Sequence, residues 1–331
     1  MKNNSNFIFC SGLGSTGSSA FINLLQEYEE INVFDREFRL LVDPNGILDL
    51  RRDLFDNWSY FKSDMALRRF KNLYSNLSNR GLGPYALLRH SSVFKDFDEK
   101  CNNYFNELIF EEYDGIWYGI DTLLSRVIIK LGFKKRGYLN SRKMYIPNEI
   151  DKQQFDLITR SFLNNLFLNK KNSFKRTVIE ENLLGFFATE ISEILPGSKI
   201  INVIRNPLDV ISDSIRVNWH ACPQNISKYI KFQKLAYSRL IEKENTYRKS
   251  KIYGKSILTL KFEDLVLKTE KTRFEIENFL EISKLGKSAN KFFNPNISKK
   301  NIHIYKRFLS DEHISVIKKE FDFFLSHYNY Q

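Results

Sequence analysis

The sequence predicts an α/β fold in which a mostly parallel sheet is flanked by helices and interrupted by a large helical insertion. Short apolar and β-branched runs alternate with helix-length patterns in the first and last parts of the chain, which is typical of parallel strands covered on both faces. The chain has 331 residues, of which 42% are hydrophobic, enough for one sizeable core or two modest ones. We expect a single domain over residues 1–331.

The chain opens with a strand, a turn and a helix. An apolar strand is expected over residues 6–10, a glycine-rich turn over 12–17 and a helix from about 18 to 29. A second short strand, 31–34, ends in Asp35-Arg36-Glu37. This β-turn-α-β opening has a loop of the size that holds a phosphate.

Residues from about 44 to 171 have a different character. The runs LFDNWSYFKSDMALRRFKNLYSNL and YFNELIFEEYDGIWYGIDTLLSRVIIKLGF place apolar residues three and four apart, which predicts amphipathic helices. We interpret this stretch as a helical insertion rather than as a second independent domain.

The alternating pattern resumes near residue 177 and continues to the end of the chain. Strands are expected over 177–180, 200–204 and 256–262. Helices are expected over 183–195, from about Asp209 onward, over 226–249, near 271–280 and over 311–327.

Composition restricts the class of partner. The net charge is +12, which suits a polyanionic small molecule or an acidic glycan, and no zinc finger, basic tail or RNA-binding aromatic signature points to nucleic acid. We expect no membrane span, because no run of about 18 apolar residues occurs, and no metal, because no Cys/His cluster has ligand spacing. Three scattered cysteines and an N-terminal apolar patch too short for a signal peptide indicate a cytoplasmic protein.

The segment 199–217 carries the first candidate site. A buried strand ends at Arg205-Asn206-Pro207, and a helix begins under Asp209. A cation at the carboxyl end of a strand, next to a helix amino terminus, is a common way for open α/β sheets to hold an anion. Arg205 can donate two hydrogen bonds to a phosphate, and Ser212 or Ser214 could reach the same group. The plain alternative is an Arg that caps a sheet edge beside an ordinary helix start.

The glycine loop allows two functional interpretations. Gly12-Leu13-Gly14-Ser15-Thr16-Gly17 matches G-x-G-x-x-G between a strand and a helix, and Asp35 lies where a ribose-binding acid belongs in a nicotinamide- or flavin-binding domain. The loop is also rich in hydroxyls, which suits a terminal phosphate better than a pyrophosphate crossing bare glycines. A purely structural turn is the third possibility.

Four segments in matching order resemble the PAPS-dependent sulfotransferase family (PAPS is 3′-phosphoadenosine 5′-phosphosulfate). They are the loop Gly12–Ser19, the Arg205–Val210 segment, the Phe262-Glu263-Asp264-Leu265 segment and the C-terminal stretch with Lys299, Lys300 and Asn301. The resemblance covers most of the chain and implies a P-loop NTPase-like sulfotransferase fold. It does not extend to the insertion, where acceptor specificity usually lies in this fold.

The resemblance implies a set of cofactor-binding residues. The loop would bind the 5′-phosphosulfate, Arg205 and a helix serine the 3′-phosphate, and the C-terminal stretch would close over the nucleotide. The residues implied are Gly12, Gly14, Ser15, Thr16, Gly17, Ser18, Ser19, Arg205, Ser212, Ser214, Lys299, Lys300 and Asn301.

Two positions depart from the family pattern. Ser15 stands where the loop normally carries Lys or Arg, a cation that stabilises charge in the transition state. Arg36, Arg39, Lys175 and Arg176 are candidate replacements. The first two would also suit an acidic acceptor, with an ion pair to Glu37 as the plain alternative. Asp213 stands where the helix serine is usual, so we consider Ser212 and Ser214, lean slightly to Ser212, and expect Asp213 to point away from the phosphate.

The expected function is transfer of a sulfuryl group from PAPS to a hydroxyl of a carbohydrate or small metabolite, without a metal, leaving adenosine 3′,5′-bisphosphate. A general base should take the proton of the acceptor. Glu37 and Glu181 are the first candidates; Glu180, His90 and His220 are weaker. The alternatives are a nicotinamide-dependent oxidoreductase and a non-catalytic nucleotide-binding relative. The sequence does not indicate the acceptor or the oligomeric state.

Overall fold

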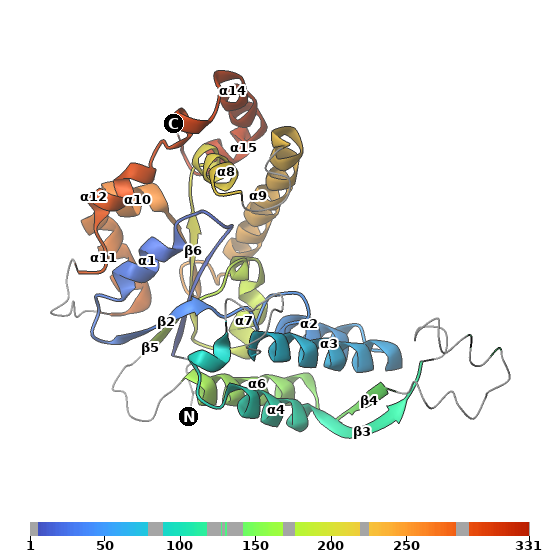
Figure 1. The fold of residues 1–331 in the computed structure, drawn as a ribbon. Coiled ribbons are helices and arrows are strands. Elements are labelled where there is room, and N and C mark those ends of the chain that lie inside the picture. Colours follow the sequence, from blue (N-terminus) through green and yellow to red (C-terminus); the bar gives the residue numbers. More distant parts are fainter. Residues whose placement is uncertain are drawn as a thin grey trace. The chain divides into compact units, whose positions relative to one another are not determined.

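The computed structural model divides into two compact units, Met1–Phe38 with Lys171–Gln331, and Arg39–Lys170 (Figure 1). The structure describes residues 6–78, 89–117, 127, 130, 142–167, 176–218, 225–282 and 291–330. The boundaries of the second unit are close to those of the expected insertion; the expectation that the whole chain acts as a single domain stays a prediction.

The first unit contains a five-stranded sheet in which every neighbouring pair of strands is parallel. The strand order is β2-β5-β1-β6-β7. This confirms the α/β class with a parallel sheet, and all the strands lie within a few residues of the predicted ranges. The strands are β1 (Phe7–Gly12), β2 (Ile31–Glu37), β5 (Arg176–Glu180), β6 (Lys199–Ile204) and β7 (Ile257–Lys261).

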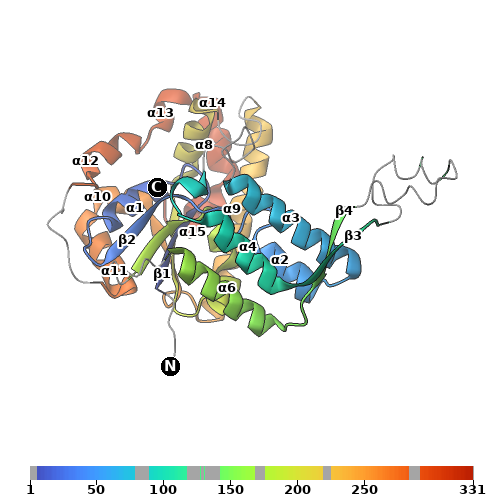
Figure 2. The ribbon, with the colours of Figure 1, turned by 60° about the horizontal axis from the view of Figure 1, so that its bottom comes forward.

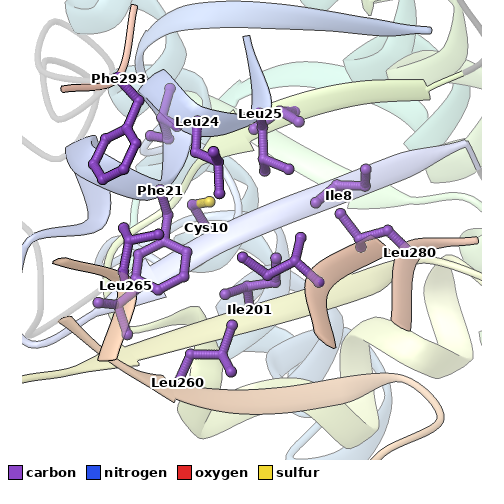
Figure 3. Close-up of a cluster of buried hydrophobic side chains, with 14 of the residues drawn as sticks. Ile8, Cys10, Phe21, Leu24, Leu25, Ile201, Leu260, Leu265, Leu280 and Phe293 are labelled. Atoms are coloured by element: carbon purple, nitrogen blue, oxygen red, sulfur yellow. The ribbon is translucent and has the colours of Figure 1, made fainter. Parts of the chain in front are cut away.

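Helices cover both faces of this sheet. Successive side chains of a strand point to opposite faces, and on β1 Ile8 and Cys10 face α1, α10 and α11 in a core that Figure 3 shows. On the other side, α8, α9, α14 and α15 pack in a second cluster around Tyr237, and both views of the ribbon show these two groups of helices on opposite sides (Figure 2). The helices are α1 (Ser18–Leu25), α7 (Ala188–Ile194), α8 (Pro207–Arg216), α9 (Ile226–Lys249), α10 (Phe262–Leu267), α11 (Thr269–Leu280), α12 (Pro295–Ser298), α13 (Tyr305–Phe308), α14 (Asp311–Glu320) and α15 (Asp322–His327), with 3-10 turns at Leu184–Phe187 and Lys299–Asn301.

Three predicted helices are shorter or interrupted. The first ends at Leu25, and the one predicted over 183–195 begins with the 3-10 turn. The helix predicted over 311–327 is two helices, because Phe321 leaves the helical conformation with φ −109° and ψ 14°. The break buries Phe321 fully, where its ring packs edge-on against Tyr237.

The second unit is mainly helical, as predicted. Its helices are α2 (Ile47–Arg51), followed by a π-helical turn (Arg52–Asp56), α3 (Tyr60–Ser78), a 3-10 turn (His90–Ser92), α4 (Phe97–Leu108) and α6 (Lys152–Phe167). A buried ion pair joins α2 to α6: Nη2 of Arg51 lies 2.7 Å from Oδ2 of Asp156. Within the described residues, no helix is both long and apolar enough to span a membrane.

The prediction of a helix through residues 109–115 is wrong. Ile109–Gly115 forms β3, which pairs with β4 (Arg142–Pro147) in a two-stranded antiparallel sheet. Opposite charges meet across the strands, since Lys143 Nζ lies 3.5 Å from Glu112 Oε1 and 3.4 Å from Asp114 Oδ1. Cross-strand pairs of this kind favour a strand, although the local spacing of apolar residues also fits a helix.

Candidate functional site

The strand order places the two candidate turns side by side. β1 and β6 are adjacent and parallel, so the glycine loop after β1 and the Arg205-Asn206-Pro207 turn after β6 leave the same edge of the sheet. The chain passes from β1 to the β2 side and later crosses to the β6 side. This is the kind of switch point, at the carboxyl ends of strands, where open α/β sheets bind ligands.

The same strand order argues against a nicotinamide-binding domain. In the dinucleotide-binding order the second strand of the chain lies next to the first. Here β5 separates β2 from β1. The backbone of Asp35 in β2 therefore lies one strand spacing, about 4.8 Å, beyond the sheet position that a ribose-binding acid would occupy.

Small residues shape the glycine loop. Ser15 has φ 61° and Gly17 has φ 93°, both in the left-handed region. A side chain on Gly12 would overlap the hydroxyl of the buried Thr16, so the loop turns tightly over its own backbone. Gly14 is half-buried, and Ser19 is exposed on the first turn of α1.

Arg205 links three of the four predicted segments. Its guanidinium, only 4% exposed, donates from Nη1 to the carbonyl of Ser15 at 2.9 Å and from Nη2 to the carbonyl of Asn301 at 2.6 Å. Its Nη1 also lies 3.9 Å from Oδ2 of Asp213. Its Nε has no hydrogen-bond acceptor among the described residues. The two turns thus converge with the C-terminal segment around one cation.

The ring of Phe262 lies between the two turns. The guanidinium carbon of Arg205 is 5.2 Å from the ring centroid, within the range of a cation–π contact. A Cβ on Gly17 would collide with the same ring. Phe262 therefore packs against both the glycine loop and Arg205.

Helix α8 follows the second turn and begins as the sequence predicts. The side chain of Asn206 caps it, with Oδ1 accepting from the N–H of Leu208 at 3.0 Å, and Pro207 occupies the first helical position. Ser212 and Ser214 are both fully buried. The hydroxyl of Ser214 lies beside the phenol of Tyr229. Neither that hydroxyl nor the hydroxyl of Ser212 has a hydrogen-bond partner among the described residues.

Asp213 does not turn away from the cation, contrary to the expectation from the sequence. Its Oδ2 faces Nη1 of Arg205, and its Oδ1 accepts from Nη2 of Arg216 at 2.7 Å. The carboxylate is thus shared between two arginines, which offsets its charge next to the candidate anion site.

Two carboxylates, the buried Asp209 and the half-buried Glu263, accept hydrogen bonds from the backbone around the site. Glu263 accepts from the N–H of Asn206 at 2.9 Å and from the hydroxyl of Tyr330 at 3.0 Å. Asp209 accepts from the N–H groups of His303 at 3.0 Å and Tyr305 at 3.2 Å. Burial raises the pKa of both carboxyls, although these hydrogen bonds oppose the rise.

Lys299, Lys300 and Asn301 are exposed at the start of the segment that Asp209 holds.

Candidate acid–base groups meet at the ends of β5 and β2. Glu180 accepts from the hydroxyl of Ser18 at 2.6 Å, and Glu37 accepts from Nδ2 of Asn182 at 2.6 Å. Glu37 and Glu180 are paired across the two strands. Burial, and then the charge of Glu37, raise the pKa of Glu180, while the bond from Ser18 lowers it. Glu181 is 0% exposed.

The remaining predicted residues are divided between the two units and the part of the chain outside the described residues. Arg36 is half-buried in β2, next to Glu37. Arg39 belongs to the second unit, where its Nε pairs with Asp43 at 2.9 Å. Arg176 begins β5 and so lies at the amino edge of the sheet, which makes it unsuitable as the missing loop cation.

His90 is fully buried in the second unit against the rings of Phe94 and Phe97, as a core histidine. Lys175 and His220 lie outside the described residues.

The sequence did not point to the supporting roles of Asp209, Phe262 and Glu263. Asp209 stood out only as a residue of the helix start, and the other two only as parts of a motif. Their partners lie far away in the chain: Tyr330 is 67 residues from Glu263, and Tyr305 is 96 residues from Asp209. Only the order of the motifs could have suggested such contacts. In the described part of the chain, no group of three or more His, Cys, Asp or Glu side chains could hold a metal ion.

The fold and site define an α/β protein with a candidate anion site where the central strands end. A family model described as "Sulfotransferase family" matches residues 129–285, a stretch that includes Arg205 and Glu263 but not the glycine loop. This match confirms the resemblance predicted from the motifs: over residues 129–285 the chain is similar to the sulfotransferase family. No curated protein sequence matches the chain.

Solved structures give distant matches. The sulfotransferase STF9 from Mycobacterium avium is 10% identical with a TM-score of 0.41, and the alignment covers 98% of this chain and 76% of that one. The sulfotransferase domain of the Synechococcus PCC 7002 olefin synthase is 14% identical with a TM-score of 0.39, covering 96% and 94%. The sulfotransferase domain from the curacin biosynthetic pathway is 12% identical with a TM-score of 0.42, covering 99% and 98%. At such scores the family assignment rests on the family model and the motifs.

Proposed function

We propose that this protein transfers a sulfuryl group from PAPS to a hydroxyl of a carbohydrate or small-metabolite acceptor. The observation that carries the proposal is a set of buried donors, in the glycine loop and in the segment from Arg205 into α8, that have no partner within the described part of the chain. The Oγ of Ser15, the Oγ of Ser212 and the Nε of Arg205 have no hydrogen-bond partner among the described residues. An unmet buried donor costs about 1–3 kcal/mol, so these three donors, one of them on Arg205 itself, favour a ligand rich in acceptors.

The residues present fit a nucleotide with phosphates at two positions. The glycine loop, with Ser15, Thr16 and the amino end of α1, would hold the 5′-phosphosulfate through N–H groups and hydroxyls. Arg205 and Ser212 would hold the 3′-phosphate, with Ser214 as a second choice, and Lys299, Lys300 and Asn301 would cover the nucleotide. When bound, PAPS supplies the sulfuryl group, and the bisphosphate is the leaving group.

The task of the protein in such a transfer is mainly positioning and charge stabilisation. The acceptor oxygen forms a bond to sulfur, the bond from sulfur to the phosphate oxygen breaks, and the acceptor proton passes to a carboxylate. Glu37 suits this role better than Glu181, because Glu37 is half-buried while Glu181 is fully buried. Arg36 could supply the charge that Ser15 lacks. The net charge of +12 favours an acidic acceptor.

We also propose a cytoplasmic location. The described cysteines Cys10 and Cys101 are free and buried, as expected of reduced thiols. No nucleic-acid partner is proposed.

A ligand panel followed by a transfer assay tests the function. Adenosine 3′,5′-bisphosphate should raise the melting temperature and bind in calorimetry, whereas nicotinamide dinucleotides should do neither. Labelled sulfate should then pass from PAPS to at least one of a panel of neutral and acidic glycans, alcohols and phenols. Stabilisation by a nicotinamide dinucleotide alone would overturn the proposal. Bisphosphate binding without transfer would favour a non-catalytic relative, which Ser15 in place of the loop cation makes the second candidate.

A further inference from the structure

Residues 299–305, called the strap below, are held to the site by two side chains of one short stretch. Nη2 of Arg205 donates to the carbonyl of Asn301 at 2.6 Å. Both carboxylate oxygens of Asp209 then accept from the strap, Oδ2 from the N–H of His303 and Oδ1 from the N–H of Tyr305. His303 has φ 58°, a left-handed conformation that a non-glycine residue keeps only when its surroundings impose it.

Asp209 is not needed to begin the helix that carries it. Asn206 already caps α8 with its side chain. Asp209 is 1% exposed, so its charge is costly to bury unless hydrogen bonds compensate for the lost water. Both of its oxygens are committed to the strap. The side chain therefore holds a distant segment rather than its own helix.

We propose that Asp209 is a positioning residue of the nucleotide site. By fixing the backbone at His303 and Tyr305, it holds Lys299 and Lys300 of the strap close to Arg205, where they attract an anionic nucleotide. This inference rests on the proposed function. Asp209 acts only through the strap, because its own negative charge opposes an anionic ligand.

Whether Asp209→Asn strengthens or weakens nucleotide binding distinguishes a positioning role of Asp209 from a purely electrostatic one. Asp209→Asn removes a negative charge near Arg205, so electrostatics alone would make adenosine 3′,5′-bisphosphate bind more tightly. If Asp209 positions the strap, binding should instead weaken by about tenfold, which corresponds to about 1.4 kcal/mol. Isothermal calorimetry on the full chain measures this, with circular dichroism to verify folding.

Asp213→Asn is the matched control. It removes the same charge from the same helix, and Asp213 also faces Arg205, but its hydrogen bonds go to Arg216 rather than to the strap. Bisphosphate affinity should stay equal or increase. Weakening by Asp213→Asn as large as that by Asp209→Asn would show that any lost carboxylate disturbs Arg205, and the inference would fail.

Two further measurements keep the inference testable. When Lys299 and Lys300 are already replaced by alanine, adding Asp209→Asn should weaken bisphosphate binding little further. The reason is that the effects of residues acting through the same contacts are not additive. Amide hydrogen exchange at His303 and Tyr305 should quicken in Asp209→Asn without any ligand. If Asp209→Asn does not fold, the lysine pair alone must weaken binding, and unchanged affinity would refute the inference.

The failure of the inference and that of the proposed function are distinguishable. A wild-type protein that does not bind the bisphosphate would refute the proposed function. A wild-type protein that binds it, with an Asp209→Asn variant that binds equally or more tightly, would refute only the role of Asp209.

Discussion

Nη1 of Arg205 donates to the main-chain carbonyl of Ser15 at 2.9 Å, across 190 residues of sequence. This bond joins the turn after β6 to the turn after β1. Because β1 and β6 are adjacent in the sheet, the two turns begin close to each other. The two segments that the motifs predict to bind opposite ends of one nucleotide therefore lie together at one edge of the sheet.

Replacing Arg205 should affect both binding and stability. Arg205→Ala should abolish measurable bisphosphate binding in calorimetry. It should also lower the free energy of unfolding by about 1–3 kcal/mol, because the carbonyls of Ser15 and Asn301 lose their donor. Urea denaturation measures the second effect.

Arg205→Lys is the control for charge. A lysine keeps the cation but cannot donate along two fixed directions. We expect intermediate affinity, at least tenfold below wild type. Wild-type affinity in Arg205→Ala would rule out the assignment of this residue.

Gly17→Ala should destabilise the protein more than a left-handed backbone alone explains. The new Cβ would meet the ring of Phe262, in addition to the cost of alanine at φ 93°. Gly254→Ala is the matched control for the left-handed backbone. Gly254 has φ 74°, but no atom lies within 4 Å of the place that the new methyl group would take. We expect a loss of about 1 kcal/mol for Gly254→Ala and a clearly larger loss for Gly17→Ala in urea denaturation. Equal losses of stability in the two variants would mean that the ring of Phe262 can move aside at no measurable cost, which would contradict this prediction.

The sequence predicted the elements that depend on local patterns. Apolar runs predicted the strands of the parallel sheet, and Asn206-Pro207 predicted the start of α8, because capping and proline geometry are local properties. The convergence of the two turns also followed from the motif order. These predictions used residues whose behaviour depends on near neighbours in the chain.

Contacts between segments far apart in the chain could not be predicted from the sequence. Nothing local shows that the oxygens of Asp209 reach the N–H groups of His303 and Tyr305. The pairing of β3 with β4 was equally hidden, since it depends on cross-strand charges that involve Lys143. Arg176 was misjudged because strand ends look alike in sequence, although only the carboxyl ends of parallel strands reach the site.

Glu263 should stabilise the turn before α8. Glu263→Ala removes the acceptor of the buried Asn206 N–H and of the Tyr330 hydroxyl. The free energy of unfolding should fall by about 1–3 kcal/mol, and bisphosphate affinity should fall with it. Asp264→Ala, next in the chain, breaks an ion pair with Lys268 and no other side-chain hydrogen bond or ion pair within the described residues. It should change stability by less than about 0.5 kcal/mol. Equal effects of the two variants in urea denaturation would contradict this role.

The pH dependence of stability should reflect Glu180. Burial raises the pKa of its carboxyl above the ordinary 4.5, so the folded state binds a proton that the unfolded state releases. The contribution of this group to stability is then full below pH 4.5 and is lost as the pH rises through the raised pKa.

Two variants test this sign. Glu180→Gln should be most stable relative to wild type at neutral pH, with the difference shrinking as the pH falls towards 4.5. Ser18→Ala removes the hydrogen bond that favours the ionised form, so the loss of stability on raising the pH should become larger. Urea denaturation between about pH 4 and 8 measures both. A difference between Glu180→Gln and wild type that grows on acidification would contradict the raised pKa.

Glu37 should carry the proton transfer if the proposed reaction is right. Its carboxyl group lies at the end of β2, oriented by the amide of Asn182 at 2.6 Å, and it remains partly accessible. Glu37→Gln preserves size and removes basicity, so kcat should fall by about 10²–10⁴-fold while bisphosphate affinity stays within about threefold, less than 1 kcal/mol. Glu181→Gln should lower stability rather than kcat, because that side chain is fully buried. A large loss of kcat in Glu181→Gln with a normal Glu37→Gln would exchange the two assignments.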